Sequence, residues 1–150
     1  MNKKWINRFM EVVDVVATWS KDRSTKCGCV IIGKNNEILS TGYNSFPRGV
    51  DDNIDLRHQR PVKYLYTEHA ERNAIYNAAR NGVKLEGTIM ILKWYPCANC
   101  ARAIIQSGIK KIYCEKPGDS EKDQRWKDEF RVSSTIFDEA GVEVNFIEEL

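Results

Sequence analysis

Three stretches of this chain end in the same signal, a glycine followed at once by an apolar residue. The three signals are Asn81-Gly82-Val83, Ser107-Gly108-Ile109 and Ala140-Gly141-Val142. Glycine adopts the left-handed conformation that closes an α-helix at little steric cost, so each signal is typical of a helix end. The helices are expected just before the signals, at residues 69–81, 98–107 and 121–140.

A short apolar segment follows each of these helices, and we expect strands at "TIMIL", "KIYC" and "EVNFI". Because a whole helix separates each strand from the next, these strands should be parallel. Two more strands are expected in "CGCVIIGKNNEILSTGYN", after an amphipathic first helix at residues 3–19. The pattern predicts an α/β fold in which helices cover one mixed sheet.

The size and charge of the chain limit the classes of protein to which it can belong. Its 150 residues suit one domain, residues 1–150, with a single core. The formal net charge of +2 argues against nucleic acid or an anionic membrane as a partner, although one or two local cations could hold a small anion. No apolar run reaches the roughly 18 residues of a membrane span. The N-terminus also lacks the apolar segment of a signal peptide, so we expect a cytoplasmic protein.

Two short motifs stand at the beginnings of two of the expected helices. His69-Ala70-Glu71 begins one, and "PCANC", which contains Cys97 and Cys100, begins the next. A histidine and a glutamate at a helix start are often only a solvated pair, because glutamate is favoured near the positive end of the helix dipole. A Cys-x-x-Cys pair alone could be a redox pair, half of a structural metal site or two buried small side chains.

Taken together, the two motifs supply the ligands of one zinc site. His69, Cys97 and Cys100 provide an imidazole and two thiolates, which zinc prefers. Structural zinc sites usually have four protein ligands, whereas catalytic sites have three and leave the fourth position for water. Zinc lowers the pKa of such a water, and Glu71 is placed to take its proton.

The other candidate ligands fit a fourth zinc position less well. His58 lies in a long connection at residues 45–66. We interpret the remaining cysteines as buried strand residues, although one of the first two could approach a metal; they are Cys27, Cys29 and Cys114.

From about Trp19 to Val144 the chain resembles the cytidine and deoxycytidylate deaminase superfamily, and most closely its deoxycytidylate (dCMP) deaminases. The resemblance rests on the zinc motif H-x-E followed by P-C-x-x-C and on four longer blocks. These are "SKDRSTKCGCVI", "STGYNSFPRG", "KYLYTEHAERNAI" and "YPCANCARAIIQSGIKKI". It implies a three-layer α-β-α cytidine-deaminase-like fold with a mixed five-stranded sheet. It also implies one catalytic zinc ion on His69, Cys97 and Cys100, with Glu71 moving protons while water attacks C4 of cytosine.

The resemblance further implies a set of substrate contacts. Asn44 would reach the sugar, although a turn at this position would favour asparagine on backbone grounds alone. The backbone around Ala70 and Tyr95 would read the pyrimidine edge. Tyr64 and Tyr66 match positions that line the pocket, although aromatic packing beneath a loop is an alternative for both. Arg23 or Lys21 could meet a 5′-phosphate, or could be solvated charges.

The chain departs from the family pattern at four places. One is Glu68, which precedes the zinc-binding histidine where many members carry a small or apolar residue. Arg23 replaces a frequent proline. Ser45 replaces the usual glycine of a Gly-Tyr-Asn-Gly loop, which argues against regulation by deoxynucleoside triphosphates. The connection at residues 45–66 has no cysteine and one histidine, so we predict no second zinc.

The leading hypothesis is a zinc-dependent enzyme of pyrimidine nucleotide supply that converts the small nucleotide dCMP to dUMP and ammonia. One alternative is the same chemistry on another cytosine or adenine substrate, including a nucleic-acid base bound through "RHQRPVK" at residues 57–63. A second alternative is a zinc-stabilised binding module without turnover. The apolar first helix, a Trp126/Phe130/Phe137 stripe and the family resemblance suggest a homo-oligomer, although such stripes are more often core.

Overall fold

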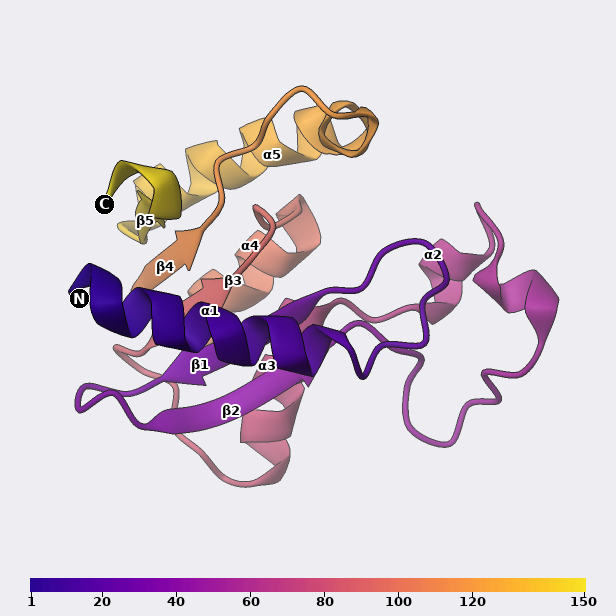
Figure 1. Cartoon of the computed structure of the whole chain (residues 1–150), viewed down its shortest axis with the longest axis horizontal. Helices are drawn as coiled ribbons and strands as arrows, with labels where there is room; N and C mark the ends of the chain where they lie inside the picture. Colours follow the sequence, from indigo (N-terminus) through magenta and orange to yellow (C-terminus); the bar gives the residue numbers. More distant parts are fainter.

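The computed structural model describes residues 1–150, which form one five-stranded sheet with helices on both faces (Figure 1). The strands are β1 (Gly28–Ile32), β2 (Ile38–Tyr43), β3 (Ile89–Leu92), β4 (Lys111–Cys114) and β5 (Glu143–Phe146). Their order in the sheet is β2-β1-β3-β4-β5. β1 is antiparallel to both of its neighbours, whereas β3, β4 and β5 are parallel. The predicted mixed sheet with parallel last strands is confirmed.

The helices divide between the two faces of the sheet. On one face α1 (Lys3–Ala17) packs Ile6, Phe9 and Val13 against β1 and β3. On the other face lie α3 (Ala70–Arg80), α4 (Ala98–Gln106) and α5 (Glu121–Ala140), which share a larger apolar core. The predicted three-layer α-β-α arrangement is therefore confirmed.

The predicted helix boundaries are close to the observed ones, because the signals that set them are local. Glycine closes α5 in the left-handed conformation, with a φ angle of 69° at Gly141. The connection at residues 45–66 contains short helical segments that the sequence did not predict. These are the 3-10 helix η1 (Asp55–His58) and the single-turn helix α2 (Lys63–Tyr66). A further 3-10 turn, η2 (Ile147–Glu149), follows β5. The structure contains no apolar helix of the length that a membrane crossing requires.

The first turns of α3 lie directly against β2, at Gly42. A Cβ atom at this position would overlap the carbonyl oxygen of Ala70 and the backbone nitrogen of Ala74. Ser40, on the same strand, donates a hydrogen bond of 2.7 Å to the carbonyl oxygen of Ala74. These contacts place the beginning of α3 at a fixed height above the sheet.

We expect Gly42→Ala to lower the free energy of unfolding by about 2 kcal/mol, because both overlapping groups are backbone atoms and cannot rotate away. Urea unfolding measures the change. Gly118→Ala is the matched control, because its Cβ would meet only the carboxylate of Asp123, at an ordinary 3.5 Å. Equal stability of the two variants would contradict the close packing of β2 on α3.

Candidate active site

The beginnings of α3 and α4 bring the two motifs together. His69 is the N-cap residue of α3, Cys97 is the N-cap residue of α4, and Cys100 lies in the first turn of α4. Ser133 of α5 donates a hydrogen bond of 2.9 Å to the carbonyl oxygen of Pro96, just before α4. Because both helices pack on the same face of the sheet, their N-terminal ends meet at one place.

The three predicted ligands form a compact group. Nδ1 of His69 lies 3.5 Å from Sγ of Cys97 and 3.5 Å from Sγ of Cys100. The three donor atoms all lie within 4.8 Å of one another. Zinc bonds of about 2.1 Å to nitrogen and about 2.3 Å to sulfur give a tetrahedron with edges of about 3.6 Å. One imidazole and two thiols at this separation therefore fit a zinc ion that keeps one position open.

The surroundings favour a charged Cys97 more than a charged Cys100. The hydrogen bond from Cys100 lowers the pKa of Cys97 to about 3, against the effect of burial. Burial, together with the bond to Cys97, raises the pKa of Cys100. The guanidinium of Arg72 donates to Sγ of Cys100 at 3.6 Å and supplies one nearby positive charge. A zinc ion would supply the rest of the charge that two buried thiolates require.

Glu71 lies beside this group without belonging to it. The residue is only 8% exposed, and its carboxyl group lines the cavity next to His69 and Cys97. Burial raises the pKa of Glu71, although the neighbouring His69 works in the opposite direction. A buried carboxyl group with a raised pKa, next to a metal position, can both accept and release a proton.

A cavity of about 110 Å³ opens above Glu71 and contains several of the predicted substrate-binding residues. Those that line it are Asn44, Tyr64, Ala70 and Tyr95. The cavity is lined by side chains from segments far apart in the sequence, including the loop before β1, α2, the segment after β3, and α5.

Three other predicted residues do not line this cavity. Tyr66 packs on Phe46 and lies beneath the guanidinium of Arg57. Lys21 forms an ion pair of 2.8 Å with Asp52, and Arg23 forms one of 2.7 Å with Asp55. Both cations are already paired with carboxylates at the surface.

The cysteines outside the zinc motif lie in two different environments. Cys29 and Cys114 are fully buried in the apolar core, as we expected. Cys27 instead precedes β1 and lines the cavity, so it is not a strand residue.

Sequence reasoning missed the contribution of α5. Trp126 stands edge-on to the rings of His69 and Tyr64, with centroid distances of 5.8 and 6.0 Å. Lys122 lies one turn earlier, over the ring of Trp94. Glu129 accepts a hydrogen bond of 2.9 Å from the backbone nitrogen of Ala98, the first residue of α4. The four-residue spacing of Lys122 and Trp126, which places both on one helix face, was the signal available in the sequence.

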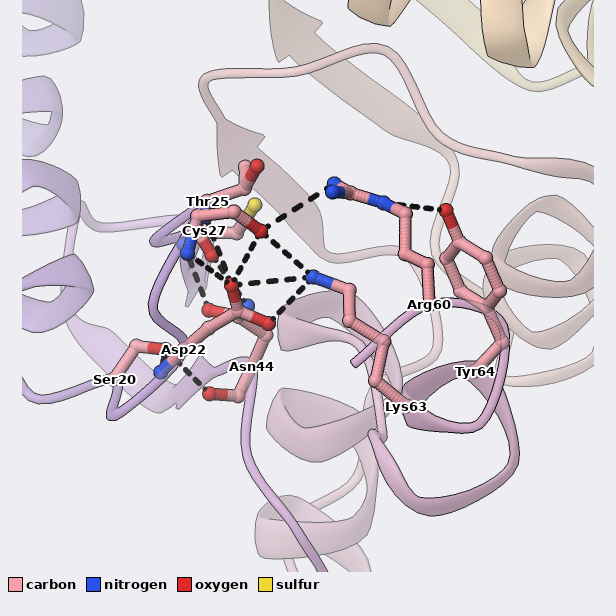
Figure 2. Close-up of polar contacts among 9 residues, drawn as sticks. Ser20, Asp22, Thr25, Cys27, Asn44, Arg60, Lys63 and Tyr64 are labelled. Atoms are coloured by element: carbon pink, nitrogen blue, oxygen red, sulfur yellow. Dashed lines mark hydrogen bonds and ion pairs between the residues drawn. The ribbon is translucent and has the colours of Figure 1, made fainter. Parts of the chain in front are cut away.

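A buried ion pair holds the loop before β1 (Figure 2). Nζ of Lys63 lies 3.0 Å from Asp22, and their side chains are only 8% and 9% exposed. The carboxylate of Asp22 also accepts hydrogen bonds from the backbone nitrogens of Ser24 and Thr25. The pair therefore ties the loop at residues 20–27 to α2 across the cavity.

The amide of Asn44 takes part in the same network. Its Oδ1 accepts a hydrogen bond of 2.8 Å from the backbone nitrogen of Cys27, and its Nδ2 donates one of 2.8 Å to the carbonyl oxygen of Thr25. One Nδ2 hydrogen is left for a ligand. Asn44 thus positions the loop as well as lining the cavity.

A three-layer α-β-α fold with a His-Cys-Cys group and a neighbouring glutamate defines the class of zinc-dependent deaminases. Residues 3–116 match the family model described as the cytidine and deoxycytidylate deaminase zinc-binding region. The chain belongs to this family, and zinc is its metal.

Individual relatives agree with the family assignment. An "uncharacterized deaminase in luxG 3′region" of Aliivibrio fischeri is 44% identical over 147 residues, 98% of this chain and 96% of the relative. The deoxycytidylate deaminase of Homo sapiens is 34% identical over 146 residues, 93% of this chain and 77% of the relative. The crystal structure of dCMP deaminase from cyanophage S-TIM5, in complex with dCMP and dUMP, superposes with a TM-score of 0.77 at 25% identity, covering 97% and 98% of the two chains.

Replacing one thiolate should remove the metal. We expect Cys97→Ser to lower bound zinc from one ion per chain to less than about a tenth of that, because a serine hydroxyl is a poor zinc ligand. Atomic absorption on the purified protein measures the content. Cys27→Ser serves as the control and should keep its zinc. A zinc content unchanged in Cys97→Ser would rule out the proposed ligand set.

The Asp22–Lys63 pair should make stability depend on pH. Burial tends to raise the pKa of Asp22, but hydrogen bonds from Thr25 and Ser24 and the ammonium of Lys63 lower it from 3.8 to about 2. The stabilisation is therefore fully present above about pH 4 and is lost as the pH falls through 2.

Accordingly, Asp22→Asn should lower the free energy of unfolding by about 3 kcal/mol at pH 7, because it leaves the ammonium of Lys63 buried without its partner. The difference from the unmodified protein should shrink as the pH falls from 4 towards 2. Denaturant unfolding at several pH values tests this, with the exposed Asp128→Asn as the control. A difference that stays constant with pH would show that the ion pair does not stabilise the fold.

Proposed function

We propose that this protein catalyses the zinc-dependent hydrolytic deamination of dCMP to dUMP and ammonia. The observation that carries the proposal is the buried Glu71 carboxyl group, which lies in the cavity beside the His-Cys-Cys group without belonging to it. A purely structural metal site has no need of this group. The names of the human relative and the phage structure support dCMP as the substrate.

In this reaction water adds to C4 of cytosine and the bond between C4 and the exocyclic nitrogen breaks. When bound, zinc would act as a Lewis acid that makes a water reactive near neutral pH. Glu71 takes the proton that the water loses and delivers it to N3 of the base. It then carries a second proton from the new hydroxyl group to the departing amino group, which leaves as ammonia. Because Glu71 ends each cycle as it began, it serves as both base and acid.

The base would be held by backbone groups and aromatic rings of the cavity. Ala70 is the first residue of α3, so its backbone N–H has no acceptor within the helix and can donate to the pyrimidine. Tyr95 directly precedes Pro96, the first residue of the "PCANC" motif, and offers a carbonyl oxygen. The rings of Tyr64 and Trp126 border the same space. Asn44 has one amide hydrogen left for the sugar.

We further propose that residues 1–150 act as one deaminase domain, in the cytoplasm, and that the chain forms a homo-oligomer. The structure offers an exposed apolar surface for self-association on and just after α1, where Val15 is 57% exposed and Trp19 is 56% exposed. The Trp126/Phe130/Phe137 stripe is not such a surface, because Phe137 is fully buried and the other two residues line the cavity.

No observation favours a nucleic-acid substrate. The side chains of "RHQRPVK" are mostly engaged within the protein. Arg57 covers Tyr66, His58 stacks on Phe46, and Lys63 is paired with Asp22. These residues offer no continuous groove of free cations along which a nucleic-acid backbone could lie.

We expect Glu71→Gln to keep its zinc and its fold but to reduce ammonia release from dCMP by at least about 100-fold, because the amide cannot carry the protons. A coupled ammonia assay measures the rate, and metal analysis with circular dichroism checks zinc and folding. Glu139→Gln, an exposed change on α5, is the control. Turnover that survives in Glu71→Gln would disprove the proposed role.

A further inference from the structure

α5 places an unpaired cation in the active-site cavity. Lys122 lies in the first turn of α5, and its side chain lines the cavity. Its ammonium nitrogen is buried, has no hydrogen-bond partner and lies 3.1 Å from the centre of the Trp94 ring. The ring face attracts the cation but accepts none of its three N–H groups in a conventional hydrogen bond. A buried ammonium in this state is expected to favour an anionic ligand.

The other cations that line the cavity differ from Lys122. Lys63 is neutralised by Asp22, and Arg125 is exposed to solvent. Arg60 is exposed and donates hydrogen bonds to two neutral hydroxyl groups, that of Tyr64 (Figure 2) and that of Ser24. Lys122 is therefore the buried cation of the cavity that lacks an acceptor.

The nearby carboxylates, Asp123 and Glu71, do not supply that acceptor: both act on Lys122 through their charge, and neither is hydrogen-bonded to it. Asp123 is the next residue and also lines the cavity, but its carboxylate accepts hydrogen bonds from the backbone and hydroxyl groups of Ser120. The bond from the Ser120 backbone, together with the one that the Asp123 backbone nitrogen donates to the Ser120 hydroxyl, forms the capping box that begins α5. The position of Asp123 is thus fixed by the helix end, while Lys122 extends towards Trp94.

Aromatic contacts connect Lys122 to Arg60 on the other side of the cavity. Trp126, one turn after Lys122, meets the ring of Tyr64 edge-on at 6.0 Å. The hydroxyl group of Tyr64 in turn accepts a hydrogen bond of 2.9 Å from Nε of Arg60. The contact between Trp126 and Tyr64 therefore lies between the two cations. The ammonium of Lys122 is buried, and Arg60 is exposed.

We propose that Lys122 binds the phosphate group of the nucleotide substrate, with Arg60 as a second, more exposed donor. This inference rests on the proposed function, because it assigns a residue to the part of dCMP that distinguishes it from deoxycytidine. A phosphate offers three strong acceptor oxygens, and the ammonium offers three donors that have no acceptor in the free protein. Burial lowers the pKa of Lys122 to about 8, and an anion beside the ammonium would favour its charged form.

The test compares kcat/KM for dCMP with kcat/KM for deoxycytidine in the unmodified protein and in Lys122→Gln. The ratio of the two values should fall at least about 30-fold in Lys122→Gln, mainly through KM for dCMP, because only the nucleotide loses an ionic contact. Lys122→Arg should recover most of the ratio. The exposed Lys127→Gln is the matched control and should leave the ratio unchanged.

Calorimetric binding of dUMP and deoxyuridine gives a second measure that needs no turnover. Lys122→Gln should weaken dUMP binding by a similar factor relative to deoxyuridine. Equal losses for nucleotide and nucleoside would mean that Lys122 only supports the ring of Trp94, and no loss for either would place the phosphate elsewhere. Both results would overturn the inference. If the unmodified protein prefers deoxycytidine to dCMP, the proposed function itself fails, whatever the variants do.

Discussion

The site depends on the meeting of two helix N-termini that carry one zinc-binding group between them. Neither His69 nor the Cys97–Cys100 pair has the ligands for a metal alone, and both thiols are buried. Packing of α3 and α4 on one face of the sheet brings the three donor atoms within 4.8 Å of one another. Zinc then offsets the cost of two buried thiolates, so the metal and the packing of the two helices support each other. The first turn of α3 also places Glu71 beside these ligands.

The cavity beside this centre is built largely by segments that carry none of the three metal-binding residues. The ion pair of Asp22 with Lys63 ties the loop before β1 to α2, and this loop carries Cys27 and contacts Asn44. α5 supplies Trp126 and Lys122 on the opposite side. In the proposed function the zinc group and Glu71 carry out the reaction, and the loop and α5 line the cavity beside them.

The sequence predicted the parts of the molecule that local signals determine. Glycine stops gave the helix ends, apolar runs gave the strands, and the two motifs gave the zinc group. It did not reveal long-range pairings. Lys21 and Arg23 looked free in the sequence, but Asp52 and Asp55 pair with them from the connection at residues 45–66.

The sequence also did not show which side chains point into the cavity. Tyr64 lines the cavity and Tyr66 does not, because residues two apart on a helical turn point to different sides. The role of α5 was missed for a related reason. Its apolar stripe read as ordinary core, and only the fold shows that its first turns face the cavity.

The most direct measurement is a comparison of dCMP, CMP, deoxycytidine and dCTP as substrates under identical conditions, with and without bound zinc. We expect the zinc-loaded protein to convert dCMP fastest, with one ammonia released for each dUMP formed. Removal of zinc by a chelator should abolish this activity, and added zinc should restore it. Absence of deamination of all four compounds by the zinc-loaded protein, or equal rates after zinc removal, would contradict the account.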